Sequence, residues 1–308
     1  MGLKTAVVIA SDETQFPAAV FLASRLLALR PGRTQVVIAT DYGRGIELAR
    51  QILPECSFQR VRTMKGLLPS WMPRISGAAF LRYYLPEILG KYFARILYLD
   101  TDTYPDHRNI FRLLNMDMEG HSVAAVRDIK TTFGRSEESA RELSHAGPSG
   151  KYLNSGVLLI DNAAWTRQRL VRKVMEAVNE HGLHDQAALN YVLRGDWLEL
   201  SPLVNMTIAA QNTVFKGVRP LLTHFMGLRK PWSPIWAENH RARREMVAFL
   251  RGTPWPYFIE PVISPQPAYL DPDTDFAGVR RYVETTEFAD VKCGISRAIQ
   301  YPASTRAL

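Results

Sequence analysis

Cysteine is scarce in this chain, which has two in 308 residues, Cys56 and Cys293. They are far apart and neither is flanked by residues at metal-ligand spacing, so we expect no disulfide framework and no cysteine-based metal site. Long hydrophobic runs are also missing, because VVIA, VLLI and MVAFL fall far short of the roughly 18 apolar residues that span a membrane. The apolar run near the start is too short for a secretory signal, and we expect a cytoplasmic protein.

The composition is that of a folded, basic protein. Hydrophobic residues make up 46% of the chain, enough for a sizeable core, and its length suits one large domain with an appendage or two small domains. An excess of lysine and arginine gives a net charge of +8 and a pI near 9.5. This balance favours anionic partners such as nucleic acid, an anionic membrane or a phosphorylated ligand, and does not choose among them.

Apolar runs alternate with stretches of helical spacing along the first 130 residues. The pattern predicts strands at 4–14, 34–41, 58–64, 95–100 and 122–128, and helices at 16–32, 45–53 and 78–89, the last broken at Pro86. A polar excursion follows at 130–150, then a strand within 152–165, helices at 167–182 and 185–195, and a strand end near 224. Such alternation is typical of an α/β fold with a parallel, doubly wound sheet.

Acidic residues stand where the predicted strands end: Asp12, Asp41, Asp100 and Asp128. Ligands of doubly wound sheets bind beyond the carboxyl ends of the strands, so we expect the site there. Neither GxGxxG nor GxxxxGK[ST] follows any of these strands, which disfavours a classical dinucleotide site and a P-loop.

Asp100 and Asp102 follow the apolar strand RILYL two residues apart. Side chains at this spacing point the same way only if the chain stays extended past the strand. Two carboxylates on one side repel each other, and a divalent cation would relieve that repulsion. The alternative is that Asp102 caps the next turn, and the spacing alone leaves both interpretations open.

Four stretches of the chain resemble one enzyme family in content and order. YLDTDTYP carries the DxD pair Asp100 and Asp102, and it is followed by YLNSGVLLID with Asn154, HDQAALNYVL with Asp185 and Gln186, and THFMGLRKPW with His224, Gly227 and Lys230. Together they resemble glycosyltransferase family 8, the retaining galactosyl- and glucosyltransferases typified by bacterial lipooligosaccharide enzymes. The resemblance covers about residues 5–235 and implies a single GT-A-type (Rossmann-like) nucleotide-sugar-binding domain with a mostly parallel central sheet.

The resemblance implies a metal ion at the DxD pair. Asp100, Asp102 and His224 would hold Mn²⁺, with Mg²⁺ as the alternative, against the diphosphate of a UDP-sugar. Carboxylate oxygens with one imidazole suit Mn²⁺ better than Ca²⁺, and the ion would stabilise the departing UDP as a Lewis acid. Taken alone, His224 is more often a core histidine.

Further residues match family positions that bind the donor nucleotide. Lys230 would reach a phosphate, the backbone at Gly227 would allow close approach, and Arg82 would lie near the donor sugar and diphosphate. Asp12 matches a carboxylate near uracil and ribose, although the two residues after it depart from the family pattern. The alternatives are a solvated basic loop around Lys230 and a structural arginine at position 82.

The transferred sugar would be surrounded by Asp128, Asn154, Asp185 and Gln186, of which Asp185 is also a candidate helix N-cap. Gln186 takes the position of a nucleophile, but an amide is a poor nucleophile, so the resemblance implies a front-face mechanism with retention. Gln186 would then stabilise the oxocarbenium-like state through its carbonyl oxygen. The expected activity is transfer of a hexose, galactose or glucose, from a UDP-sugar to a saccharide or lipid-linked glycan acceptor.

Two loops are candidates to close over the donor and exclude water, 69–77 and 227–232. Each has a candidate hinge glycine and a candidate shielding tryptophan, Gly77 with Trp71 and Gly227 with Trp232. Both tryptophans are equally compatible with ordinary packing.

The chain changes texture near residue 252, after which prolines are frequent. We expect a glycosyltransferase domain over 1–252 and a C-terminal appendage over 253–308, with a helix between 276 and 300. Residues 240–252 form a basic amphipathic stretch that favours either peripheral contact with an anionic membrane, at the inner face of the cell membrane, or packing against the domain.

Two other functions compete with sugar transfer. A haloacid dehalogenase-type phosphatase also places DxD after an apolar strand and would use Asp100 as its nucleophile, but its motif opens the chain and has Thr or Val where Tyr104 stands. A non-enzymatic nucleic-acid-binding protein would fit the pI, yet the arginines are dispersed and no RNA or DNA motif with stacking aromatics is evident, so we expect no nucleic-acid partner.

Overall fold

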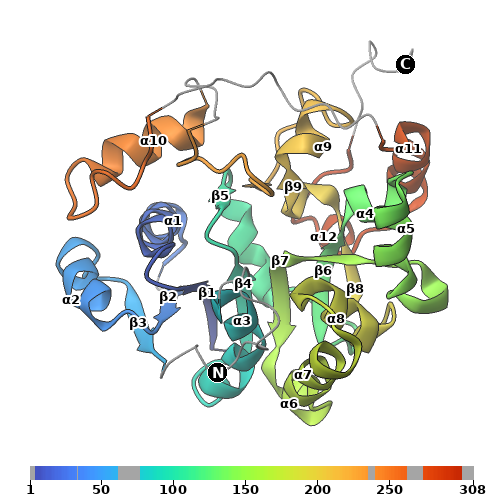
Figure 1. The fold of residues 1–308 in the computed structure, drawn as a ribbon, viewed down its shortest axis with the longest axis horizontal. Helices are drawn as coiled ribbons and strands as arrows, with labels where there is room; N and C mark the ends of the chain where they lie inside the picture. Colours follow the sequence, from blue (N-terminus) through green and yellow to red (C-terminus); the bar gives the residue numbers. More distant parts are fainter. Residues whose placement is uncertain (1–3, 33, 62–76, 235–239, 262–272, 300–308) are drawn as a thin grey trace.

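The computed structural model describes residues 4–32, 34–61, 77–234, 240–261 and 273–299 (Figure 1). Its centre is a seven-stranded sheet in the order β3-β2-β1-β4-β7-β6-β8. The strands are β1 (Thr5–Ser11), β2 (Gln35–Thr40), β3 (Ser57–Arg60), β4 (Arg95–Leu99), β6 (Val123–Arg127), β7 (Leu153–Asp161) and β8 (Leu198–Leu200). All neighbours pair in parallel except β7, which is antiparallel to both β4 and β6. The expected α/β fold with a mostly parallel sheet is confirmed.

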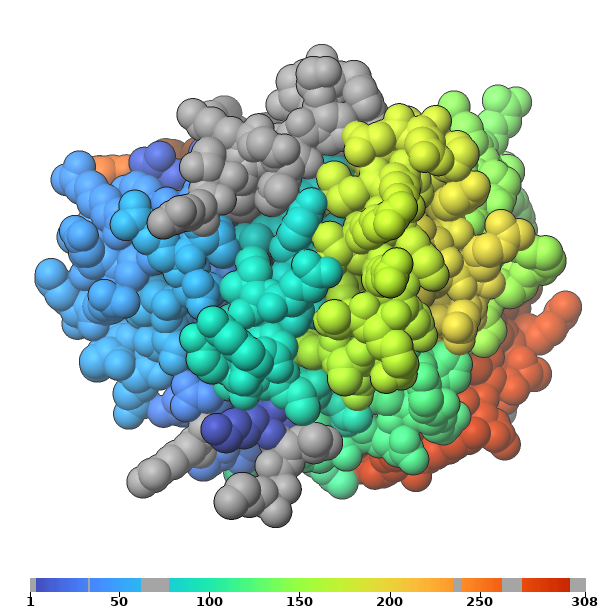
Figure 2. Space-filling view, turned by 90° about the horizontal axis from the view of Figure 1, so that it is seen from below, coloured from blue at the N-terminus to red at the C-terminus, as the bar shows by residue number. Residues whose placement is uncertain are grey.

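Helices cover both faces of this sheet, and its strands β1, β2 and β4 are accordingly near-continuous apolar runs. Along β1, Ala6 and Val8 face one cluster, and Val7 and Ile9 face the other. The first cluster lies under α3 (Gly77–Leu89), α6 (Asn162–Arg167), α7 (Leu170–His181) and α8 (Asp185–Leu193). The second lies under α1 (Phe16–Leu29), α2 (Gly43–Ile52) and the 3₁₀ segment η2 (Arg108–Asn115). Figure 2 shows α3 and α7 side by side on the first face.

The predicted break at Pro86 is wrong, because α3 continues through it to Leu89. Proline removes one helical hydrogen bond. Here Tyr83, Leu85 and Leu89, on both sides of Pro86, are buried against the sheet, and this burial holds the helix together across the missing bond. The end of α7 agrees with its prediction, since Gly182 takes the left-handed conformation with φ of 64°.

A second, three-stranded sheet lies beside the first, in the order β5 (Thr103–Pro105), β10 (Leu222–His224) and β9 (Met206–Thr207). Of its strands, the sequence predicted only the strand end near 224. β10 runs antiparallel to β5 and pairs His224 with Thr103. This pairing brings a late segment of the chain against the residues that follow β4. The 3₁₀ segment η4 (Pro202–Val204) precedes β9, and α9 (Ile208–Asn212) follows it.

The polar excursion contains α4 (Ile129–Phe133), α5 (Glu137–Ser144) and η3 (Gly147–Ser149). The hydroxyl of Tyr152, just before β7, donates to Glu142 of α5 over 2.7 Å and ties the excursion to the sheet. The excursion therefore packs against the edge of the sheet where the acidic residues follow the strands.

The basic helix α10 (Arg241–Leu250) packs against the domain. Its Ala242, Met246 and Leu250 are buried with Phe21 of α1 and with Tyr104, so its apolar face is covered by protein (Figure 1). Membrane contact therefore gains no support from this helix. Within the described residues, no helix combines the length and the hydrophobicity needed to cross a bilayer.

The expected helix between 276 and 300 is two shorter ones, α11 (Phe276–Thr285) and α12 (Ala289–Lys292). Both pack on the domain, and the buried carboxylate of Asp290 accepts hydrogen bonds from the backbone and hydroxyl of Ser201, each over 2.7 Å. The division at residue 252 stays a prediction. Cys56 and Cys293 are free thiols, as expected.

Candidate active site

A turn, and not an extended segment, carries Asp100 and Asp102 beyond β4. The carbonyl oxygen of Asp100 accepts hydrogen bonds from the backbone of Thr103 over 3.2 Å and from its hydroxyl over 2.8 Å. The two carboxylates thus converge because the chain folds back at once into β5, a geometry that spacing alone did not reveal. Asp102 is 8% exposed and Asp100 is half-buried.

His224 is brought to this turn by the pairing of β10 with β5. The backbone of Phe225 donates to the carbonyl of Asp102 over 2.9 Å, and His224 Nε2 lies 3.2 Å from Asp102 Oδ1. One ligand atom from each of Asp100, Asp102 and His224 lies within 4.8 Å of the others, so the three could hold a divalent cation. Two carboxylates and an imidazole form a donor set that suits Mn²⁺ or Mg²⁺.

Gly156 of β7 is part of this arrangement although the sequence did not single it out. A Cβ at this position would lie 2.2 Å from Cε1 of His224 and 2.9 Å from Oδ2 of Asp100. The first distance is one that real Cβ atoms essentially never show. The missing side chain therefore makes the room in which the imidazole and carboxylate meet.

Cations of the protein balance both carboxylates. Arg82 lies 3.2 Å from Asp100 and 3.4 Å from Asp185, and Lys230 pairs with Asp102. Burial raises the pKa of Asp100, and Arg82 opposes that rise. Burial would also raise the pKa of Asp102, but Lys230 and His224 outweigh it and hold this pKa below its usual range. Repulsion between the carboxylates is thus relieved by Arg82 and Lys230 in this structure.

The side chains expected around the sugar form a second cluster at the ends of β6 and β7. Asp128 caps α4, because its Oδ1 accepts from the backbone of Thr131 over 2.9 Å. Its Oδ2 accepts from Asn154 Nδ2 over 3.0 Å and from Gln186 Nε2 over 3.2 Å. The carbonyl oxygen of Gln186 accepts from the backbone and the hydroxyl of Ser155, over 3.0 and 3.3 Å.

Both clusters open into one cavity of about 290 Å³. Its lining contains eight of the predicted residues, Arg82, Asp100, Asp102, Asn154, Asp185, Gln186, His224 and Lys230, together with the backbone of Gly227. Asp128 lies behind this lining. Asp12 lies at the end of β1, outside the lining, where its carboxylate accepts from the backbone of Gln15 over 2.9 Å and from the hydroxyl of Thr14 over 2.7 Å.

His184, Ser155 and Met226 also line the cavity and were not predicted. His184, and not Asp185, is the N-cap of α8, so the predicted capping role of Asp185 is wrong. Nε2 of His184 lies 2.9 Å from Glu142, and the pKa of His184 is raised to about 10 because Asp185 and Glu142 outweigh the lowering effect of burial. The only feature of the sequence that could have pointed to these three residues is that each is next to a predicted site residue.

Of the two loops expected to close over the donor, 69–77 falls almost wholly outside the described residues, Trp71 included. The loop 227–232 is described. Gly227 has a φ of 73°, which glycine adopts readily, and the ring of Trp232 packs 5.4 Å from that of Phe258. Trp232 therefore serves as a packing residue in this structure.

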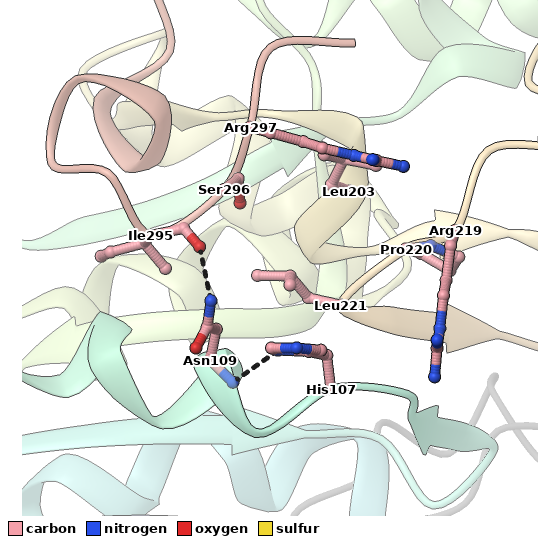
Figure 3. Close-up of a pocket in the computed structure, with 9 residues that line it drawn as sticks. All are labelled: His107, Asn109, Leu203, Arg219, Pro220, Leu221, Ile295, Ser296 and Arg297. Carbon is pink, nitrogen blue, oxygen red and sulfur yellow. Dashed lines mark hydrogen bonds between the residues drawn. The ribbon is translucent and has the colours of Figure 1, made fainter. Parts of the chain in front are cut away.

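A second cavity, of about 280 Å³, lies at the opposite end of the β5/β10 pairing (Figure 3). Leu221 and Arg219 before β10, the start of η2 and the segment 295–297 line it. Asn109 lies between Ile295 and His107: its side-chain amide donates to the carbonyl of Ile295 over 3.2 Å, and its backbone N–H donates to Nδ1 of His107 (Figure 3). It contains none of the predicted site residues.

Comparisons with known proteins agree with this architecture. Proteins similar in sequence include general stress protein A of Bacillus subtilis (strain 168), 30% identical over 62% of this chain and 70% of that protein, and the lipopolysaccharide 1,2-glucosyltransferase of Escherichia coli (strain K12), 26% identical over 71% and 69%. The match to glycosyltransferase GlyA of Streptococcus pneumoniae serotype 4, 30% identical, spans 59% of this chain and only 25% of GlyA.

Solved structures show the same fold at lower identity. The galactosyltransferase LgtC, in complex with donor and acceptor sugar analogs, has a TM-score of 0.66 and 19% identity over 81% of this chain and 96% of that one. The bifunctional glycosyltransferase WbbM has a TM-score of 0.66 and 16% identity, and the match spans 84% of this chain and 51% of that one. The expected GT-A-type fold is therefore confirmed.

A family model decides the assignment. The model of glycosyl transferase family 8 matches residues 52–235, which is more than half of the chain and contains every predicted site residue except Asp12. Sugar transfer is thereby favoured over the phosphatase and nucleic-acid alternatives. The chain belongs to glycosyltransferase family 8.

Proposed function

We propose that this glycosyltransferase transfers a hexose from a UDP-sugar to a saccharide or glycolipid acceptor, with retention at the anomeric carbon and with a divalent cation, Mn²⁺ or Mg²⁺. The observation that carries the proposal is the triad of Asp100, Asp102 and His224, which opens into the same cavity as the cluster around Gln186. The space that Gly156 leaves free at this triad supports it, because any side chain there would displace His224.

The cation, held by the triad, would supply Lewis-acid stabilisation of the leaving diphosphate. Lys230 would add a second positive charge. Its ammonium pairs with Asp102, and because a lysine has three donors it can keep this partner and donate to a phosphate oxygen as well. Lys230 is 28% exposed, which leaves the ammonium accessible to a ligand.

Arg82 is better suited to position carboxylates than to bind phosphate. Its Nε donates to the carbonyl of Ala79, one terminal nitrogen donates to the carbonyl and hydroxyl of Ser155, and the other faces Asp100 and Asp185. These contacts account for the five N–H donors of a guanidinium. We therefore assign Arg82 the role of fixing the two carboxylates at the cavity wall.

Asp185 would stay ionised and accept hydrogen bonds from sugar hydroxyls, because His184 and Arg82 outweigh burial and lower its pKa. Such contacts discriminate between epimers. Gln186 would lie beside the anomeric centre, but its carbonyl oxygen already accepts two hydrogen bonds from Ser155. Stabilising an oxocarbenium-like state through that oxygen requires the side chain to rotate away from Ser155.

In the front-face reaction the acceptor hydroxyl attacks the face from which UDP departs. The bond from the anomeric carbon to the phosphate oxygen breaks, the bond to the acceptor oxygen forms, and the departing phosphate oxygen takes the hydroxyl proton. The names of similar proteins contain both a glucosyltransferase and a galactosyltransferase, so we propose glucose or galactose as the sugar. A lipopolysaccharide-type acceptor is proposed on the same ground.

A donor screen tests the proposal directly. UDP release is measured from a panel of UDP-sugars, with Mn²⁺, with Mg²⁺ and with EDTA, and the anomeric configuration of the product is read by NMR. We expect release from UDP-galactose or UDP-glucose that EDTA abolishes, and an α-linked product from an α-linked donor. Release unaffected by EDTA, or an inverted product, would refute the metal or the mechanism respectively.

A further inference from the structure

We propose that Asn205 is a positioning residue that decides which ring nitrogen of His224 carries the proton, so that Nε2 presents its lone pair at the Asp100–Asp102 site. The inference deepens the proposed function, on which its metal-binding consequence rests. Asn205 belongs to none of the sequence blocks described above and lies between η4 and β9. It is 3% exposed and does not belong to the cavity lining, so any effect on the reaction passes through another residue.

The carboxylate of Asp128 can only accept hydrogen bonds when it is ionised. Its Oδ1 accepts from the backbone of Thr131, and its Oδ2 accepts from Asn154 over 3.0 Å. The NH₂ group of Asn154 must therefore face Asp128. The backbone N–H of Gly156, 3.1 Å from Oδ1 of Asn154, requires the same orientation, because a backbone N–H needs an acceptor. Two independent partners thus fix which end of Asn154 is the carbonyl.

The orientation of Asn154 determines that of Asn205. Nδ2 of Asn205 lies 2.8 Å from the carbonyl oxygen of Asn154, a distance at which it must donate. The carbonyl oxygen of Asn205 then points the other way and lies 3.0 Å from Nδ1 of His224. If this amide were flipped, two carbonyl oxygens would meet at the Asn154 contact, and one hydrogen bond would be replaced by repulsion between buried acceptors.

The imidazole of His224 receives its orientation and its proton position from Asn205. Because the carbonyl oxygen of Asn205 cannot donate, Nδ1 of His224 must carry the proton that joins them. Nε2 is the atom 3.2 Å from Asp102 Oδ1, a contact that a second proton on Nε2 fills when no cation is bound; with the first proton fixed on Nδ1, Nε2 is the nitrogen whose lone pair is available to a cation between the two groups. His224 is 3% exposed, so bulk water does not offer Nδ1 a competing partner. Three hydrogen bonds, Asp128–Asn154, Asn154–Asn205 and Asn205–His224, therefore link Asp128, in the cluster expected around the sugar, to the tautomer of the proposed metal ligand.

The first test reads the tautomer in the metal-free protein and needs neither donor nor activity. The chain has seven histidines, and selective ¹⁵N labelling with long-range ¹H–¹⁵N correlation identifies the protonated nitrogen of each neutral ring. The signals of His224 are assigned by their loss in His224→Gln. We expect Nδ1 to carry a proton whether or not Nε2 carries one as well. A ring protonated on Nε2 alone, or rapid exchange of one proton between the two nitrogens, overturns the proposal even if the enzyme proves to be a metal-dependent glycosyltransferase.

Variants of Asn205 provide the second test. Asn205→Leu removes both hydrogen bonds at similar volume, and we expect a mixture of His224 tautomers and Mn²⁺ binding weakened about 10- to 100-fold, the effect typical for loss of a partner behind a metal-ligating histidine. Asn205→Asp keeps an oxygen toward Nδ1, so we expect its His224 to keep the Nδ1 proton and its Mn²⁺ affinity to exceed that of Asn205→Leu. A merely structural role predicts the opposite order, because Asp brings a buried charge against the carbonyl of Asn154.

Asn162→Leu is the matched control. Asn162 is also 3% exposed, follows the far end of β7, and donates to the carbonyl of Phe93 over 2.7 Å. Its loss should lower stability without changing the His224 tautomer or the affinity for Mn²⁺. Urea unfolding of all variants separates folding from binding. An Asn205→Leu variant that is folded and binds Mn²⁺ as well as Asn162→Leu would refute the proposal.

Discussion

The two sides of the cavity are stabilised in different ways. On the side of the proposed cation, called the metal side below, Asp100 and Asp102 are held by ion pairs with Arg82 and Lys230. On the side of the proposed donor sugar, called the sugar side below, Asp128 is saturated by amide and backbone donors and is 4% exposed. Lys230, whose side chain is 28% exposed, can add or exchange a partner, whereas the buried and saturated network around Asp128 cannot do so cheaply. At Lys230 the metal side can therefore accept an incoming ligand, while the sugar side keeps its shape.

The largest expected effect is at Asp102, on the metal side. Asp102→Asn removes one proposed metal ligand and the partner of Lys230, and because metal catalysis contributes several kcal/mol we expect UDP release to fall by about 10³-fold or more. Asp106→Asn is the matched control, since Asp106 follows β5 and accepts from the hydroxyl of Thr223 over 2.7 Å without lining the cavity. Equal activities of the two variants would contradict the metal site.

Arg82 tests how strongly the two sides depend on a buried charge. Arg82→Met leaves Asp100 and Asp185 facing each other without their cation, and losing one partner of a buried ion pair costs about 3–5 kcal/mol of unfolding free energy. The control is Arg172→Met on α7, whose side chain is 71% exposed and pairs with Glu176, where solvent screens the ion pair and we expect no measurable loss. Urea unfolding measures both, and similar losses would mean that Arg82 is not needed to compensate the carboxylates.

Gly156 is where the two sides meet, and filling it should damage the metal side alone. Gly156→Ala places a methyl group against His224, which costs about 1–3 kcal/mol of stability as overpacking and should displace the imidazole from Asp102. Calorimetric titration with Mn²⁺ should show weaker binding than in Gly252→Ala, where the nearest atom to an added Cβ is 3.9 Å away. Unchanged Mn²⁺ affinity in Gly156→Ala would show that His224 is not a ligand.

The smallest effect is expected where His184 borders the sugar side. Its pKa is raised to about 10 from 6.5, so its stabilising contribution is complete below pH about 6.5 and is lost as the pH rises to about 10. We expect the melting temperature to fall by a few degrees over this range, and to fall less steeply in Glu142→Gln, which removes one of its two carboxylate partners. Parallel pH profiles of the two proteins would exclude His184 as the cause.

Much of the fold could be predicted from the sequence because each strand and helix carries its own signal. Local features predicted the strands β1, β2, β4 and β6 from their apolar runs and the end of α7 from its glycine, and the structure confirms them. The direction of β7 could not be predicted, since a strand buried on both faces reads the same whether it runs parallel or antiparallel. The continuation of α3 through Pro86 depends on burial of residues on both sides, which is a tertiary effect.

In the candidate site, too, residues within local sequence motifs were predicted, and residues that act through distant contacts were missed. The DxD pair, Asn154, Gln186 and His224 stand in blocks that resemble the family, and the structure gathers them around one cavity. Gly156 and Asn205 were missed because their importance depends on distant segments of the chain. A Cβ at Gly156 would clash with His224, and the amide of Asn205 forms hydrogen bonds with both Asn154 and His224. No sequence pattern predicts the contact of Gly156 with His224 or the hydrogen bonds of Asn205.

Arg243 restricts how the segment that carries Lys230 can move. This buried arginine of α10 donates to the carbonyls of Pro231 and Ser233, over 2.8 and 2.9 Å. Gly227, with its φ of 73°, gives the other end of the segment its conformational freedom. Three residues, 228–230, lie between Gly227 and the first of the carbonyls that Arg243 anchors, so Lys230 stands on a short segment held at its far end. If Lys230 binds the diphosphate of a donor as proposed, this anchoring means that it can reach the ligand through its own side chain and residues 228–230, without rearrangement of the chain beyond Pro231.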